Sequence, residues 1–346
     1  MTTVARDAVA ASDDRGTLRQ RTGAGLLAGV SWLACRLPER PLVGLADVGG
    51  ELWYRATPGR AAMARANLGR VAAWLAAHEL GPASARRAAS DPRALERLVR
   101  AAFRHQARYY LEVARTPAMD SAYVREHLVV ENPEVVDAAF GGDRPVIFIE
   151  AHFGAVEMPG VYLADRTGRT PVAPMEAIDD PPLQRYFVRT RGALGVRIVG
   201  VRETRRELTA AIRRGDPVGI VADRDIGGGG LPTELFGAEA KLPVGPALLA
   251  VETGAAIYLA AVRRTGVGRY AGRLTEVPVP AEGTRRERIA AALSAEARAF
   301  EAAIADAPEQ WWAVFFPIWP AEEGPGREKD AREKDARDKA SREPGA

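Results

Sequence analysis

Short apolar runs alternate with amphipathic stretches between residues 120 and 320, and this alternation limits the folds open to the chain. Strands are predicted where β-branched and aromatic residues gather, at 146–149, 170–175, 196–199, 218–222, 256–262 and 270–277. Helices are predicted between or after these strands, at 183–191, 203–214, 245–252 and 285–305. Strands that alternate with helices favour an α/β fold, in which a central, mostly buried twisted sheet is flanked by helices.

The length of the chain, 346 residues, suits one large α/β domain with a substantial core. We predict a single domain over residues 19–320, made of a helical N-terminal part, 19–118, and an α/β core, 119–320. The polar leader 1–18 and the charged near-repeat 321–346, which has no apolar stripe, are predicted to be disordered. Because the charges of the tail nearly cancel, we expect it to contribute little to membrane binding.

Two amphipathic helices are predicted between Arg19 and Tyr54, separated by the segment 38–41 with its two prolines. They can pack on the main domain as a helical pair, anchor the protein on a membrane surface, or do both. The apolar stretch 23–37 is too short and too interrupted for a membrane span, and no signal-peptide cleavage pattern follows it. We therefore expect peripheral attachment to a membrane.

The charge and the cysteine content narrow the classes of protein further. A net charge of +3 on an arginine-rich chain suits anionic partners such as phospholipid head groups, phosphates or nucleic acid, without choosing among them. The single cysteine, Cys35, excludes an intramolecular disulfide and a cysteine-rich metal site. No G-x-S-x-G elbow, Walker loop or G-x-G-x-x-G after a strand is present, which disfavours serine hydrolases and nicotinamide enzymes.

The predicted strand 146–149 runs directly into the motif His152-x4-Glu157. A residue just past the end of a buried strand in an open α/β sheet faces the crevice where ligands bind. There the neutral imidazole of His152 can remove a proton from an alcohol, and Glu157 can support its cation or favour the helix N-terminus. Gly154 lets the backbone approach a reacting group closely. For an isolated motif of this length, a capping His and a helix-favouring Glu are the commoner interpretation.

The sequence Asp223-Arg224-Asp225 follows the predicted strand 218–222, so it lies at the same edge of the sheet. It has three interpretations: a turn rich in Asp, a divalent-metal pair Asp223-x-Asp225 of a glycosyltransferase, or Asp223 as the carboxylate that orients His152. The residues alone do not show which of the three interpretations is correct.

Further charged residues fall near strand and helix ends on this side. They are Glu176, Arg189 and Arg191. Arginines there, and Arg224, can hold a phosphate through two parallel hydrogen bonds.

Over about residues 20–320 the chain resembles the bacterial lipid A biosynthesis acyltransferases of the lauroyl/myristoyl type, in particular their phosphatidylinositol mannoside acyltransferase branch. The resemblance rests on the order and spacing of several short motifs. They are Ala66-Asn67-Leu68, HFGAVE at 152–157, Thr190-Arg191-Gly192, GIVADRD at 219–225, the segment 235–255, and PEQWWAVFFPIWP at 308–320. The chain departs from the family's commoner pattern by having Glu157 for Asp, and Ala155-Val156 where Asn-Trp is frequent.

This resemblance implies a glycerolipid acyltransferase-like fold and a membrane-associated O-acyltransferase. His152 would be the base for direct attack of a glycolipid or phospholipid hydroxyl on acyl-CoA or an acyl carrier protein thioester. Either Glu157 or Asp223 would be its partner, and Glu176, Arg191, Arg224 and Gly154 would bind substrate. No cofactor, metal, covalent intermediate or nucleic acid is implied, and the expected location is the cytoplasmic face of the cell membrane. The alternatives are the metal-dependent glycosyltransferase and a non-catalytic lipid-binding protein of the same fold.

Overall fold

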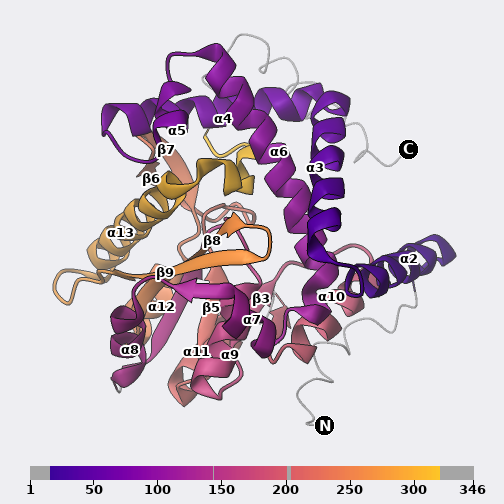
Figure 1. Cartoon of the computed structure of the whole chain (residues 1–346). Helices are drawn as coiled ribbons and strands as arrows, with labels where there is room; N and C mark the ends of the chain where they lie inside the picture. Colours follow the sequence, from indigo (N-terminus) through magenta and orange to yellow (C-terminus); the bar gives the residue numbers. More distant parts are fainter. Residues whose placement is uncertain (1–15, 143, 201–203, 320–346) are drawn as a thin grey trace, which may run out of the picture.

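A computed structural model describes residues 16–142, 144–200 and 204–319 of the protein. A seven-stranded sheet lies at its centre, with helices on both faces and a separate two-stranded hairpin (Figure 1). The order of the strands in the sheet is β1-β9-β8-β2-β5-β3-β4. Their bounds are β1 Leu128–Val130, β2 Val146–Glu150, β3 Val172–Met175, β4 Arg197–Gly200, β5 Val218–Val221, β8 Ala256–Gly266 and β9 Arg269–Val277.

Neighbouring strands of this sheet are parallel except β8 and β9, which pair antiparallel. This confirms the predicted α/β class, and each of the six predicted strands is present with ends shifted by a few residues. Sequence analysis did not predict β1 or the hairpin formed by β6 (Leu231–Leu235) and β7 (Ala238–Leu242).

Twelve α-helices are described. They are α2 Leu18–Ala34, α3 Glu39–Ala56, α4 Pro58–Ala77, α5 Ala83–Arg87, α6 Pro92–Arg115, α7 Ser121–His127, α8 Pro133–Gly141, α9 Met158–Thr167, α10 Pro181–Ala193, α11 Thr204–Arg214, α12 Gly245–Thr253 and α13 Arg285–Asp306. Short 3-10 helices at Thr116–Ala118, Pro308–Gln310 and Trp312–Phe315 complete the described part of the chain.

The middle of β2 is buried on both faces, which explains its continuous apolar run. Ile147 and Ile149 belong to the main hydrophobic core, together with residues of α4, α6, α11, α12 and α13. Phe148 points to the other face and packs against Val136 of α8 and Leu163 of α9. The sheet is therefore covered on both sides, and its ligand-binding positions are confined to the ends of its strands.

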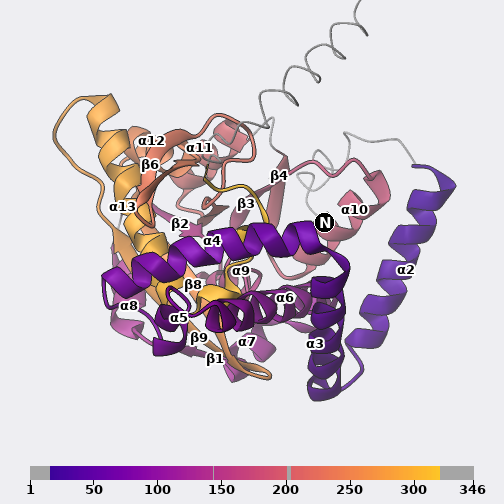
Figure 2. The same cartoon turned by 90° about the horizontal axis from the view of Figure 1, so that it is seen from above.

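The two predicted N-terminal helices are present as α2 and α3, separated at Pro38, and they lie along one edge of the molecule (Figure 2). Thr17 caps α2, so this helix begins one residue before the predicted domain start. Residues 1–15 and 320–346, which include most of the predicted leader and tail, lie outside the described residues. None of the helices that the structure describes is long and apolar enough to cross a membrane.

α3 places acidic residues against α6 and three of its large apolar residues outwards. Its acidic residues form ion pairs with α6: Asp47 with Arg108, and Glu51 with Arg100 and Arg104. Its large apolar residues Leu45, Val48 and Leu52 are 68%, 58% and 59% exposed. They are spaced by three and four residues and so share one stripe of the helix, which we call the outer stripe of α3. Trp53 and Tyr54, near the end of the same helix, pack on the main core, so α3 has apolar side chains on both its inner and its outer side.

One buried carboxyl in α13 makes stability depend on pH. Glu296 is 0% exposed, neither side-chain oxygen has a hydrogen-bond partner, and burial raises its pKa from 4.5 to about 8. Between pH 4.5 and about pH 8, Glu296 keeps its proton in the folded protein but loses it in the unfolded chain. The free energy of unfolding therefore falls as the pH rises through this range. Glu296→Gln should therefore be more stable than wild type, by about 3 kcal/mol at pH 7.

Urea unfolding at pH 5 and pH 8 measures this gap, which should widen with pH. The matched control is Glu282→Gln, because Glu282 is exposed in a loop before α13. A constant difference between wild type and Glu296→Gln at both pH values would contradict the prediction.

Candidate active site

His152 and Asp223 meet because two neighbouring parallel strands end in register. Glu150 of β2 pairs with Val221 of β5, and the N–H of Ala222 donates to the carbonyl oxygen of Glu150. Two residues further along each chain, His152 and Asp223 therefore lie side by side at the carboxyl edge of the sheet. This is the edge where open α/β sheets place their ligands.

The Asp223 carboxylate receives three hydrogen bonds and is fully buried. Its Oδ1 lies 2.6 Å from Nδ1 of His152, and its Oδ2 accepts from the His152 backbone N–H at 3.0 Å and from the Trp311 indole at 2.6 Å. Burial alone would raise the pKa of Asp223. The charge of the His152 ring and these hydrogen bonds outweigh burial and hold that pKa below its ordinary value. Asp223 is thus an ionised acceptor at neutral pH.

This pairing fixes the tautomer of His152. A carboxylate can only accept, so Nδ1 carries the proton and Nε2 of the neutral ring carries the lone pair. None of the described residues forms a hydrogen bond with Nε2. The ring is held in place by Trp312, whose own ring centre is 4.1 Å away and whose backbone N–H donates to the His152 carbonyl oxygen. The dyad can therefore act as a general base at Nε2.

The turn after His152 is fixed by close packing at Gly154. This glycine has φ +58°, and a Cβ added to it would lie 1.9 Å from the carbonyl oxygen of Val262. Its N–H donates to the carbonyl oxygen of Gln310, and its own oxygen accepts from Arg264. Only glycine fits here. Both backbone groups are occupied within the protein, and the predicted contact of Gly154 with substrate stays a prediction.

Glu157 lies with Arg191 and not with His152. Its two carboxylate oxygens accept from Nε and Nη2 of Arg191 at 3.0 and 2.5 Å. Burial by itself would lower the pKa of Arg191, but the Glu157 carboxylate raises it above its usual value, so the guanidinium stays charged. The sequence left open whether Glu157 or Asp223 contacts His152, and in the structure Asp223 does. The ion pair of Glu157 and Arg191 therefore links the start of α9 to α10.

The remaining predicted residues are spread along the same edge. Glu176 follows β3 and is exposed, and Arg189 is exposed on α10. Asp225 accepts the backbone N–H of Gly230 at 2.9 Å and so closes its own loop, while Asp223 is used by His152 and Trp311. The two carboxylates of the Asp-x-Asp pair therefore have separate partners, which disfavours the interpretation as a shared metal site. Arg224 stacks on Phe316.

Sequence reasoning gave no role to three residues near the dyad. Trp311 and Trp312 come from the C-terminal PEQWW motif, whose unusual composition was the only signal. Glu150 lies on the face of β2 that bears Phe148, and burial, followed by the negative charge of Glu157, raises its pKa to about 8. It is therefore protonated at neutral pH.

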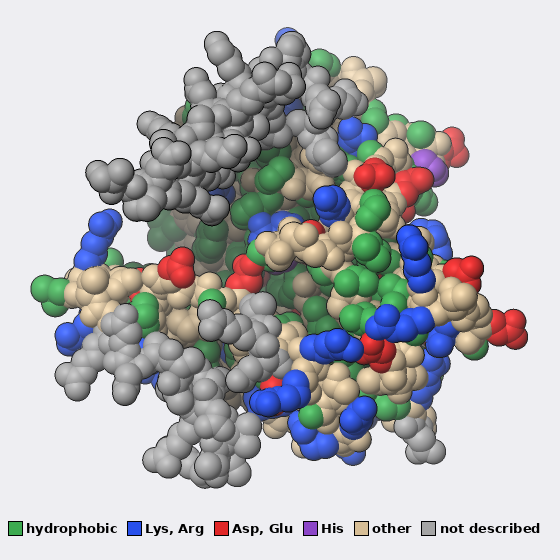
Figure 3. Space-filling model, turned by 180° about the vertical axis from the view of Figure 1, so that it is seen from behind, with side chains coloured by type: hydrophobic (Ala, Val, Ile, Leu, Met, Phe, Trp, Pro, Cys, Tyr) green, Lys and Arg blue, Asp and Glu red, His purple; other side chains and the backbone are tan. Residues whose placement is uncertain are grey.

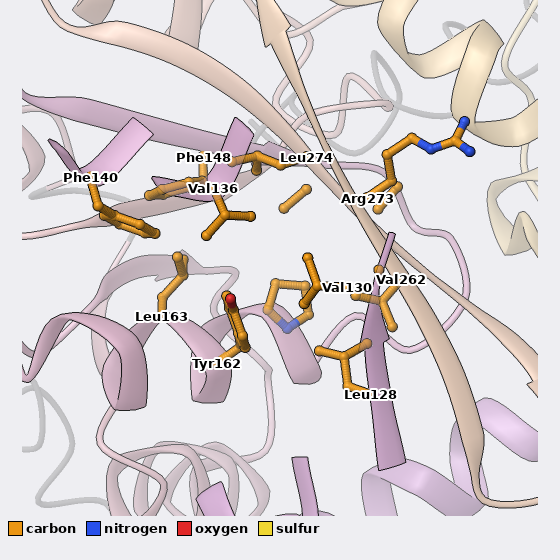
Figure 4. A pocket seen from close by; sticks show the side chains of 14 residues that line it. Leu128, Val130, Val136, Phe140, Phe148, Tyr162, Leu163, Val262, Arg273 and Leu274 are labelled. Carbon is orange, nitrogen blue, oxygen red and sulfur yellow. The ribbon is translucent and has the colours of Figure 1, made fainter. Parts of the chain in front are cut away.

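An apolar pocket lies between the sheet and the helices α8 and α9 (Figure 4). Its cavity volume is about 40 Å³, and its labelled apolar side chains converge, while Arg273 points its guanidinium away. A second, more tightly packed pocket shares Pro159, Ala260, Ala261 and Val262 with it and is also lined by Glu150 and Phe153, close to His152 in the chain.

Comparison with known proteins gives consistent matches. A family model described as bacterial lipid A biosynthesis acyltransferase matches residues 17–315. The chain is 34% identical to the phosphatidylinositol mannoside acyltransferase of Mycolicibacterium smegmatis over 166 residues, which are 46% of this chain and 54% of that protein. It is 32% identical to a protein of the same description from Mycobacterium tuberculosis strain CDC 1551 over 245 residues, 68% of this chain and 72% of that protein. It therefore spans about half the length of the first relative and nearly three quarters of the second.

Proposed function

We propose, on the premise that the chain belongs to the bacterial lipid A biosynthesis acyltransferase family, that it transfers a long fatty acyl group from acyl-CoA or acyl carrier protein to a glycolipid hydroxyl. Membership of this family makes the chain an acyltransferase. The relatives described as phosphatidylinositol mannoside acyltransferases support a mannosylated phosphatidylinositol as the acceptor. The observation that carries the proposal is the His152–Asp223 dyad, in which Nε2 of His152 bonds to none of the described residues.

The reaction would be a direct attack of the acceptor on the thioester. Nε2 of His152 takes the hydroxyl proton as the oxygen attacks the thioester carbonyl, and Asp223 balances the charge of the imidazolium. The tetrahedral intermediate then expels the thiolate, which takes the proton from His152. The backbone N–H groups of Val156 and Glu157, which donate to none of the described residues, are the free donors that this turn offers to the oxyanion.

Two further features support a lipid substrate. The apolar side chains that line the pocket between the sheet and α8 and α9 match the chemistry of an acyl chain. The face opposite to that of Figure 1 is hollowed near its centre, with hydrophobic side chains on the visible floor and Lys and Arg side chains around it (Figure 3). A surface of this kind suits amphiphiles that carry an anionic head group.

A direct screen tests the proposed activity. Purified protein is incubated with palmitoyl-CoA and with a defined phosphatidylinositol mannoside, a total glycolipid extract, or no acceptor, in the presence of a chelator. We expect free thiol and a new acyl ester to appear together, and only when a glycolipid is present. Thiol release without any ester product, or no reaction with any acceptor, would contradict the proposal.

We propose that the protein binds the membrane peripherally through α2 and the outer stripe of α3, which is Leu45, Val48 and Leu52. Ion pairs occupy the opposite face of α3, so this stripe is left for an apolar partner. Exposed arginines, Arg40 and Arg55, flank it and suit anionic lipid. Because the proposed acyl donors are made in the cytoplasm, the surface concerned would be the cytoplasmic face of the cell membrane.

Replacing the outer stripe in the triple variant Leu45→Ser, Val48→Ser and Leu52→Ser should weaken binding to anionic vesicles by roughly 100-fold. Each of the three side chains would bury about half of its surface in the membrane and so contribute about 1 kcal/mol to the free energy of membrane binding. Vesicle sedimentation measures the effect. The matched control replaces three exposed apolar residues elsewhere, Leu80, Val129 and Leu231, by Ser. Deletion of 322–346 should also leave binding almost unchanged. Equal losses in the two triple variants would contradict the assignment of the membrane surface.

A further inference from the structure

Two arginines approach one aromatic ring close to the dyad, and neither forms an ion pair with any described residue. Cζ of Arg224 lies 3.9 Å from the ring centre of Phe316. Cζ of Arg60 lies 6.0 Å from the same ring centre and 5.6 Å from that of Trp53. Nε of Arg224 is buried without a hydrogen-bond partner among the described residues. Leaving a buried donor unpaired costs free energy, so this nitrogen favours an acceptor beyond these residues.

The position of this cluster ties it to the reaction. Arg224 directly follows Asp223 in the chain. The ring of Phe316 is 6.2 Å from that of Trp312, which itself lies against His152. Phe316, which both arginines approach, is therefore linked to the imidazole through one intervening ring, that of Trp312.

The first turn of α4 adds further positive potential at Arg60. The backbone N–H groups of Gly59 and Arg60 have no acceptor among the described residues, and this turn contains no acidic residue. Unpaired N–H groups at a helix N-terminus favour a bound anion. α4 begins two residues after α3 ends, so Arg60 lies just beyond the helix that bears the outer stripe.

The other arginines close to the motif are already neutralised. Arg191 pairs with Glu157, and Arg264 pairs with Glu112 through two hydrogen bonds. A guanidinium stacked on an aromatic ring keeps its N–H edge free and matches the oxygens of a phosphate. Arg60 and Arg224 differ from Arg191 and Arg264 in having this edge available.

We propose that Arg60, Arg224 and the first turn of α4 form a binding site for a phosphate group of one of the two substrates. This inference rests on the proposed function for the identity of those substrates. The phosphate is either in the nucleotide part of an acyl-CoA donor or in the diester of a phospholipid acceptor. Phe316 serves as the platform that orients both guanidinium groups.

Equilibrium binding tests the site without any turnover. Calorimetry with CoA and with glycerophosphoinositol would compare wild type with Arg60→Gln, Arg224→Gln and the control Arg213→Gln. Arg213 is an exposed arginine in the last turn of α11 with no partner among the described residues, so its replacement changes the net charge equally. We expect either CoA or glycerophosphoinositol to bind at least about 10-fold more weakly to Arg60→Gln and to Arg224→Gln than to wild type. The same ligand should bind the control variant as tightly as it binds wild type.

Kinetics then identify the source of the phosphate. If it belongs to the donor, both variants raise KM for palmitoyl-CoA and not for palmitoyl-pantetheine, which carries no phosphate. If it belongs to the acceptor, they raise KM for a phosphatidylinositol mannoside and not for a mannosyl diacylglycerol. In both cases kcat should stay within about twofold, since uniform binding is what is lost. Because Arg60 is exposed, Arg60→Gln remains a test even if Arg224→Gln does not fold.

Three results would overturn the site: wild type binding neither probe at millimolar concentration, both variants binding as wild type does, or Arg213→Gln losing as much affinity. Arginine-dependent binding of a probe by a protein that transfers no acyl group would instead leave the site standing and refute the proposed function.

Discussion

Asp223→Asn is expected to lower turnover by about 10³–10⁴-fold while KM for the acyl donor changes little. The asparagine side chain cannot balance an imidazolium. Its NH₂ group can also donate to Nδ1, which would move the ring proton to Nε2 and remove the base. Trp311 and the backbone N–H of His152 can still donate to the amide oxygen, so the geometry of the turn should largely persist. Initial rates with palmitoyl-CoA and a glycolipid extract measure the loss.

The matched variant for this prediction is Asp225→Asn. Among the described residues, Asp225 accepts a hydrogen bond from the N–H of Gly230 alone, and an asparagine oxygen can do the same. We expect its turnover to stay close to that of wild type, with or without chelator. Equal losses at both positions, together with inhibition by chelator, would instead support the metal-dependent glycosyltransferase.

His152→Gln is expected to lower turnover by about 10²–10⁴-fold, or about 3–5 kcal/mol of activation free energy. Glutamine keeps polarity and approximate size but cannot accept a proton at neutral pH. The fold should survive, because the side chain lies just past the end of β2 and outside the main core. Circular dichroism and thermal unfolding of the variant provide the control.

The sheet was largely predictable because its central strands, β2 and β5, are largely buried. In a chain whose strands alternate with helices, continuous apolar runs such as 146–149 and 218–222 are typical of buried parallel strands. The hairpin β6–β7 was missed because much of it is exposed and it carries Glu234, Glu239 and Lys241, which weaken the strand signal. β1 has three residues, too few for any periodicity.

The candidate site was predictable only as far as strand ends determine it. His152 and Asp223 each follow a predicted strand, and the register of β2 with β5 brings them together. The partner of Glu157 was not predictable, because Arg191 lies 34 residues away on another helix. The hydrogen bond from Trp311 to Asp223 spans 88 residues, and no local pattern records such a contact.

The most direct test of the central claim is the rate at which labelled palmitoyl moves from CoA to glycolipid, measured side by side for wild type and His152→Gln in the presence of chelator. We predict glycolipid-dependent transfer by wild type and a loss of at least about 100-fold in the folded variant. Transfer at a near-normal rate by folded His152→Gln would contradict the account.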